Sequence, residues 1–161
     1  MDASGIGFID QLVLQGFFRG TIVAATLIIL CTFVHFYTFA SLNKVLKKIE
    51  KKHHLKQTLV LLFALFFAHS IQVWLFAGGY MILINGFEIG HFVTESGDMY
   101  HAGFVDALYY SIVTYTSLGF GDIIPTQAVR LLTGIEALLG LLMIAWSASF
   151  TYISMEKRWR N

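Results

Sequence analysis

Hydrophobic and polar positions fall into long blocks along the 161 residues. Three apolar blocks, 20–42, 57–84 and 127–155, are long enough to cross a membrane, because about 20 apolar residues span a hydrocarbon core of roughly 30 Å. A polar, acidic loop at 85–103 follows the second block. The apolar segment 105–115 comes next and is too short to span. The pattern predicts an all-α membrane protein with three transmembrane helices and a short helix before the last one.

The N-terminal part of the chain divides into two predicted segments. Residues 1–19 place apolar side chains at helical spacing, which favours a helix lying in the membrane interface, with a disordered tail as the alternative. Apolar residues at helical spacing continue past the first span toward the basic turn Lys51–His54, which predicts that the helix extends beyond the membrane. These residues are Leu42, Val45, Leu46 and Ile49. Residues 20–56 therefore form an extra transmembrane helix and a basic turn. In the second block, Gly78 and Gly79 indicate a kink.

Charge sets the predicted orientation. The chain is 57% hydrophobic and 13% charged, and a soluble domain carries about twice that charge. Between Gln57 and Val129 there is no Lys or Arg, whereas residues 43–56 hold six lysines and the C-terminal tail is basic. Because basic segments stay on the cytoplasmic side, we expect an outer N-terminus and a cytoplasmic C-terminus in a plasma or inner membrane. The lysine-rich turn also suits anionic lipid or a partner protein. No pattern indicates nucleic acid or identifies a regulatory partner.

One motif stands out among the apolar blocks. Residues 114–122 read Thr-Tyr-Thr-Ser-Leu-Gly-Phe-Gly-Asp, and Pro125, the only proline, follows. Glycines spaced in this way allow a backbone that alternates between extended and left-handed conformations. Such a backbone turns successive carbonyl oxygens toward one axis, where they replace the water shell of a cation. A glycine turn between two helices is the alternative.

From residue 57 to the C-terminus, the sequence resembles the potassium-channel pore family, whose filter usually reads Thr-Val-Gly-Tyr-Gly-Asp. Here the filter stands as Ser-Leu-Gly-Phe-Gly-Asp. The resemblance implies a pore domain at 57–161 with an outer helix, a re-entrant pore helix at 105–115, a selectivity filter at 117–121 and an inner helix at 127–155. It also implies a tetrameric pore, made by a homotetramer, with K⁺ as the transported ion and no other cofactor.

The resemblance also implies roles for single residues. The K⁺ ligands would be the hydroxyl of Ser117 and backbone carbonyls, and the glycines provide backbone geometry; this set is Ser117, Leu118, Gly119, Phe120 and Gly121. Filter support and the outer mouth would involve Tyr109, Tyr110, Thr114, Thr116, Asp122 and Glu136. The cavity and hinge would involve Gly140, Leu141, Ile144, Ala148 and Tyr152.

Several polar residues have two interpretations. Glu136 within the third span either hydrogen-bonds a hydroxyl or amide such as Ser70, Gln72 or Thr114, or acts in filter support or gating. His35 and His69 lie within spans, where a histidine pair can ligate haem or simply pack. His91 and His101 in the acidic loop either sense external pH or are plain exposed side chains.

No catalytic constellation is present in the sequence, so we do not expect an enzyme. The sequence predicts a potassium-selective channel. A non-selective monovalent cation channel is the first alternative, and a non-conducting or haem-bearing membrane subunit is the second.

Phe120 replaces the usual filter tyrosine and lacks its hydroxyl. We expect Phe120→Tyr to slow the loss of current during sustained opening, because the hydroxyl ties the filter to the surrounding aromatic residues in the family. Recordings from planar bilayers would measure this decay. An unchanged or faster decay would contradict the prediction.

Overall fold

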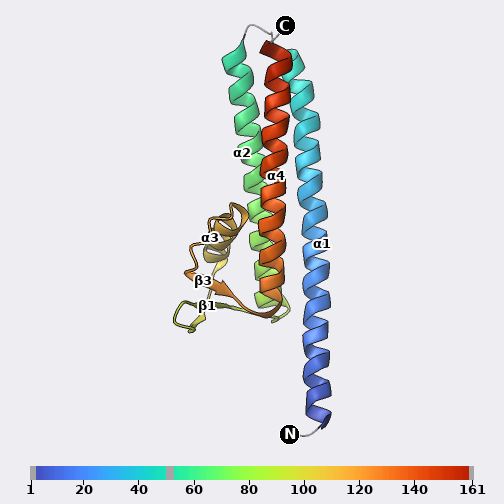
Figure 1. Ribbon diagram of the computed structural model, residues 1–161, viewed down its shortest axis with the longest axis vertical. Coiled ribbons are helices and arrows are strands. Elements are labelled where there is room, and N and C mark those ends of the chain that lie inside the picture. Colours follow the sequence, from blue (N-terminus) through green and yellow to red (C-terminus); the bar gives the residue numbers. More distant parts are fainter. Residues whose placement is uncertain (1–2, 50–52, 160–161) are drawn as a thin grey trace.

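Three long helices run side by side in the computed structural model, which describes residues 3–49 and 53–159 (Figure 1). They are α1 (Ala3–Lys48), α2 (His54–Met81) and α4 (Gln127–Trp159). Within the described residues, each contains a stretch long and apolar enough to cross a membrane. The predicted all-α architecture with three transmembrane helices is confirmed. Lys51 and Lys52 of the basic turn and Arg160 of the tail lie outside the described residues.

Helix α1 continues through Gly20 without interruption. Gly20 is therefore not a helix boundary, although the sequence suggested separate segments at 1–19 and 20–42. No proline is present to end the helix, and the glycine has a packing role instead: a Cβ there would lie 3.2 Å from the Cβ of Ala128. Gly16 similarly faces Ile89. The two glycines let α1 approach the end of the bundle that carries the sheet and α3.

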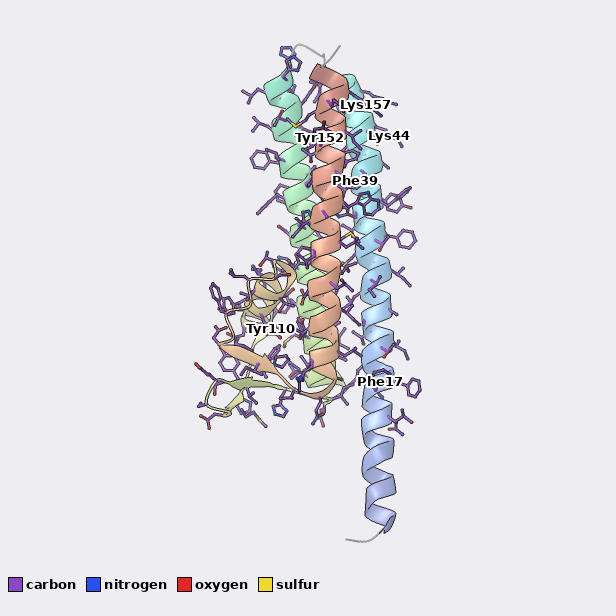
Figure 2. All side chains as sticks on the ribbon, in the orientation of Figure 1. Phe17, Phe39, Lys44, Tyr110, Tyr152 and Lys157 are labelled. Atoms are coloured by element: carbon purple, nitrogen blue, oxygen red, sulfur yellow. The ribbon has the colours of Figure 1, made fainter. Side chains whose placement is uncertain are left out.

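The opposite end of the bundle, here called the lysine end, holds Lys44 of α1 and Lys157 of α4 (Figure 2). Leu42 and Leu46 are buried there in one cluster with Leu61 and Leu65 of α2. The predicted extension of the first helix is thus confirmed, although Val45 is exposed. Phe39 of α1 also stacks on Phe150 of α4, with 4.2 Å between ring centroids.

Helix α2 runs through Gly78 and Gly79, and a π-helical turn, η1 (Ile82–Gly86), follows it. A Cβ on Gly79 would lie 2.6 Å from Cδ1 of Leu27, so this glycine makes room for α1. The departure from α-helical backbone, the π-helical turn, thus lies about one turn after Gly78 and Gly79, where the sequence indicated a kink.

A small sheet occupies the loop that the sequence suggested was merely exposed. The strands β1 (Phe92–Thr94) and β2 (Met99–Tyr100) pair antiparallel, and β3 (Ile123–Pro125) pairs with the other edge of β1. Phe92 is buried between the rings of Tyr80 and Tyr110. Through the pairing of β1 with β3, the sheet connects the loop before α3 to the chain that follows the glycine motif.

Helix α3 (Phe104–Tyr115) begins one residue before its predicted start and ends at its predicted end. Asp106 accepts a hydrogen bond from the backbone N–H of Gly103 at 2.8 Å, which satisfies a donor at the helix N-terminus. The other end of α3 meets α4 at Gly140. A Cβ there would lie 2.1 Å from the carbonyl oxygen of Tyr115. Gly140 is about 20 Å along α4 from Gln127 at 1.5 Å per residue, so α3 enters deep along the span.

We expect Gly140→Ala to destabilise the fold by about 1–3 kcal/mol, because the added methyl group overlaps backbone rather than a movable side chain. Gly134→Ala is the matched control on the same helix, since nothing lies within 4 Å of its added Cβ. Thermal unfolding in detergent measures both. Equal midpoints for the two variants would contradict this reading of Gly140.

Candidate functional site

The loop between α3 and β3 has a left-handed backbone at every second residue. The φ angles are +57° at Ser117, +58° at Gly119 and +80° at Gly121. For Ser117 this conformation is uncommon, because a side chain crowds the backbone there. Regular alternation of this kind turns neighbouring carbonyls to one side, as cation coordination by backbone oxygens requires. The glycine motif is therefore not a simple turn between two helices.

Hydrogen bonds fix the start of this loop to the end of α3. The backbone N–H groups of Leu118 and Gly119 both donate to the carbonyl of Val113, at 2.9 and 3.3 Å. The hydroxyl of Thr116 donates to the carbonyl of Ile112 at 2.8 Å. The position of the loop is therefore set by the position of the helix end.

A second set of contacts holds the far side of the loop. Tyr109 of α3 donates to Oδ2 of Asp122 at 2.8 Å. This hydrogen bond to the Asp122 carboxylate raises the pKa of Tyr109. Beyond Asp122, β3 pairs with β1, and the backbone N–H of Thr126 donates to the carbonyl of His91 at 3.0 Å. The loop is held at both ends by the same chain.

The loop itself is open in the single chain. Leu118 and Phe120 are 59% and 64% exposed. A cavity of about 350 Å³ lies between α3, the loop and α4, and Thr114, Ser117 and Thr133 are among its lining residues. Two large apolar side chains and an irregular backbone are thus uncovered in the single chain.

The two adjacent tyrosines of α3 point in different directions. Tyr109 faces the loop through Asp122, as described above. Tyr110 is buried in the bundle, where its hydroxyl lies 3.0 Å from that of Thr133 (Figure 2). Only Tyr109 of the predicted aromatic pair therefore bonds the candidate filter within its own chain.

Glu136 is fully buried where α2, α3 and α4 meet. Its two carboxyl oxygens accept hydrogen bonds from the hydroxyls of Tyr80 in α2 and Ser111 in α3. The expected kind of partner is correct, but the suggested partners, Ser70, Gln72 and Thr114, are wrong. Ser70 bonds its own helix, at the carbonyl of Phe66. Tyr80 and Ser111 reach Glu136 because α3 packs beside the end of α2 that precedes the sheet.

The predicted cavity residues separate into two groups on α4. Leu141, Ile144, Ala148 and Tyr152 are all exposed in the single chain, as a pore lining requires. Gly140 is instead buried against the end of α3. Its suggested action as a hinge stays a prediction, and close packing is a sufficient reason for its lack of a side chain.

The two membrane histidines meet at one serine in this structure. His35 and His69 both hydrogen-bond the hydroxyl of Ser147, at 2.9 and 3.0 Å, and their ring centroids are 5.2 Å apart. The Nε2 atoms of both rings are engaged by the Ser147 hydroxyl, so the pair has a packing and hydrogen-bonding role here. Among the described residues, no group of three or more His, Cys, Asp or Glu is arranged to hold a metal ion.

Comparison with protein families identifies the class that this architecture defines. A family model described as an ion channel matches residues 57–157, which run from α2 through the candidate filter to α4. The chain therefore belongs to this family of pore-loop ion channels, which is of the two-helix potassium-channel type. Comparisons with curated proteins and with solved structures give no match. Helix α1 lies outside the matched segment.

Several residues that support the site were not predicted from the sequence. One such set contains the hydroxyl partners of Glu136 and Tyr110, which are Tyr80, Ser111 and Thr133. A second set joins the two histidines and consists of Gln72, Tyr115 and Ser147. Polar side chains within apolar spans were the available signal, since such residues usually face the interior of a bundle. Their partners depend on helix rotation, which spacing along a single segment does not determine.

We expect Glu136→Leu to lower stability by about 1–3 kcal/mol, because the hydroxyl of Tyr80 would lose its close acceptor inside the bundle. Glu136→Gln keeps one acceptor oxygen and should lose less. Thermal unfolding in detergent would rank wild type above Glu136→Gln and Glu136→Gln above Glu136→Leu. If the Leu variant matched the wild type, the carboxyl would not be joining the three helices.

Proposed function

We propose that this protein conducts K⁺ passively across the membrane through a filter formed by residues 117–121 of four identical chains. The observation that carries the proposal is the left-handed backbone at Ser117, Gly119 and Gly121 in a re-entrant loop. Backbone oxygens in such a loop offer a cation a substitute for its water shell. Ser117 also offers its hydroxyl.

The need for several chains follows from burial. Irregular backbone at membrane depth is tolerated only where it lines water or is covered by protein. One chain leaves Leu118 and Phe120 largely exposed beside an open groove. Copies arranged around an axis would cover these side chains and leave only the carbonyls facing the ion. Closed rings of identical subunits are the usual way to build such an axis.

The rest of the proposal concerns the path to the filter. Leu141, Ile144, Ala148 and Tyr152 line the cavity on one side of the filter, and Asp122 concentrates cations at the other mouth. The N-terminus lies outside and the C-terminus in the cytoplasm of a plasma or inner membrane, because most lysines and arginines fall in residues 44–56 and 157–160, whereas Arg19 and Arg130 lie toward the other end.

A flux assay in liposomes tests this function. We expect the wild-type protein to release K⁺ down its gradient and to pass Na⁺ much more slowly. Gly119→Ala should abolish K⁺ flux, because a left-handed alanine is strained by about 1–2 kcal/mol in each chain. Gly97→Ala is the matched control: Gly97 also has a positive φ, +88°, but lies in the loop between β1 and β2.

The results separate the alternatives. Equal K⁺ and Na⁺ fluxes would indicate a non-selective monovalent cation channel. No flux of either ion would contradict the proposal and favour a non-conducting subunit. If Gly119→Ala and Gly97→Ala had the same effect, the loop would not be the conduction path.

A further inference from the structure

A closed ring of hydrogen bonds joins all four helices inside the bundle. Its members are His35 of α1, His69 and Gln72 of α2, Tyr115 of α3 and Ser147 of α4. His35, Gln72, Tyr115 and Ser147 are buried, and His69 is half-buried. Residues far apart in the sequence thus meet in one polar cluster within the apolar spans.

One arrangement of protons satisfies the whole ring with both histidines neutral. Gln72 Nε2 donates to Nδ1 of His35 at 2.9 Å, and His35 Nε2 donates to the hydroxyl of Ser147 at 2.9 Å. Ser147 donates to Nε2 of His69 at 3.0 Å, and His69 Nδ1 donates to the hydroxyl of Tyr115 at 2.7 Å. Tyr115 closes the ring by donating to Oε1 of Gln72. Each contact thus depends on its neighbours.

The ring acts on the end of the pore helix. Tyr115 is the last residue of α3 and lies two positions before Ser117, where the left-handed backbone starts. Its carbonyl rests against Gly140, and its hydroxyl is held by His69 and Gln72. Because Leu118 and Gly119 bond Val113 of the same helix end, a shift of that end moves the loop.

Helix α1 enters this arrangement through His35. The ring of His35 packs against Trp146 of α4 and Phe39 of α1, which fixes its orientation. A helix that only covered the outside of the pore would need no buried polar contact with α2 and α4. The polar side chains of α2 and α4 are instead arranged so that His35 completes the ring.

We propose that α1 is a filter-positioning element: His35, acting through Ser147 and Gln72, holds Tyr115 and so fixes the geometry of the loop. The expected change in ion flux rests on the proposed channel function. The expected change in the loop backbone rests on the structure alone. His35 is a positioning residue, since it touches neither the loop nor an ion path.

A double-mutant cycle in the full-length protein tests the link. His35→Phe and Tyr115→Phe keep the aromatic packing and remove the hydrogen bonds. We expect each to lower the ratio of K⁺ to Na⁺ flux in liposomes about tenfold, because each removes two buried hydrogen bonds of the ring. The double variant should be no worse than either single variant, because both break the same ring. Tyr37→Phe, at an exposed tyrosine of α1, should keep the wild-type ratio.

Amide hydrogen exchange supplies a readout that does not need conduction. The amides of Leu118 and Gly119 should exchange about tenfold faster in His35→Phe than in wild type or Tyr37→Phe. If the wild type passes no ion, the channel function fails, while exchange still decides whether His35 positions the loop. His35→Gln, which keeps a donor toward Ser147, should give an intermediate exchange rate.

Three results would overturn the proposal. The first is wild-type exchange at Leu118 and Gly119 in an assembled His35→Phe protein. The second is a double variant in which the fold-reductions of the K⁺ to Na⁺ flux ratio caused by His35→Phe and by Tyr115→Phe multiply. The third is loss of assembly in His35→Phe, in Tyr115→Phe and also in Ser147→Ala, which removes only one hydroxyl. In that case the ring would serve folding and would not specifically position the loop.

Discussion

The fold depends on one close contact, between Gly140 of α4 and the carbonyl of Tyr115. Any side chain at Gly140 would push the end of α3 away from α4, and the loop bonded to that end would move with it. The contact fixes how deeply the chain re-enters the bundle. The sheet of β1, β2 and β3 then brings the chain back to the start of α4. Candidate filter geometry is thus set by helix packing on one side and strand pairing on the other.

Apolar packing alone does not determine how helices are rotated in a membrane, because lipid tails are as apolar as the side chains. In this protein, buried polar groups supply the missing specificity. Glu136 joins α2, α3 and α4, and the ring containing His35 and Tyr115 adds α1. Both groups hold α3, the short helix that has least surface to bury, so the polar contacts are concentrated where positioning matters most.

The sequence predicts the long helices and the re-entrant segment well, because apolar block length and the glycine spacing are local signals. The bounds of α3 and the left-handed backbone at Gly119 and Gly121 follow from such signals. The sheet was missed because its strands have two or three residues and because β1 and β3 pair across the whole of α3. The partners of Glu136 and His35 were missed because they depend on the rotation of separate helices. The continuity of α1 through Gly20 was missed because the spacing of apolar residues does not show whether neighbouring helical segments join.

The central claim is that backbone oxygens of residues 117–120 from four chains bind K⁺ along one axis. Anomalous diffraction from crystals of the assembled protein soaked with Tl⁺, a K⁺ substitute, tests it most directly. We expect a row of anomalous peaks on a fourfold axis, each lying between the carbonyls of Ser117 to Phe120. An assembly without a fourfold axis, or peaks away from this loop, would contradict it.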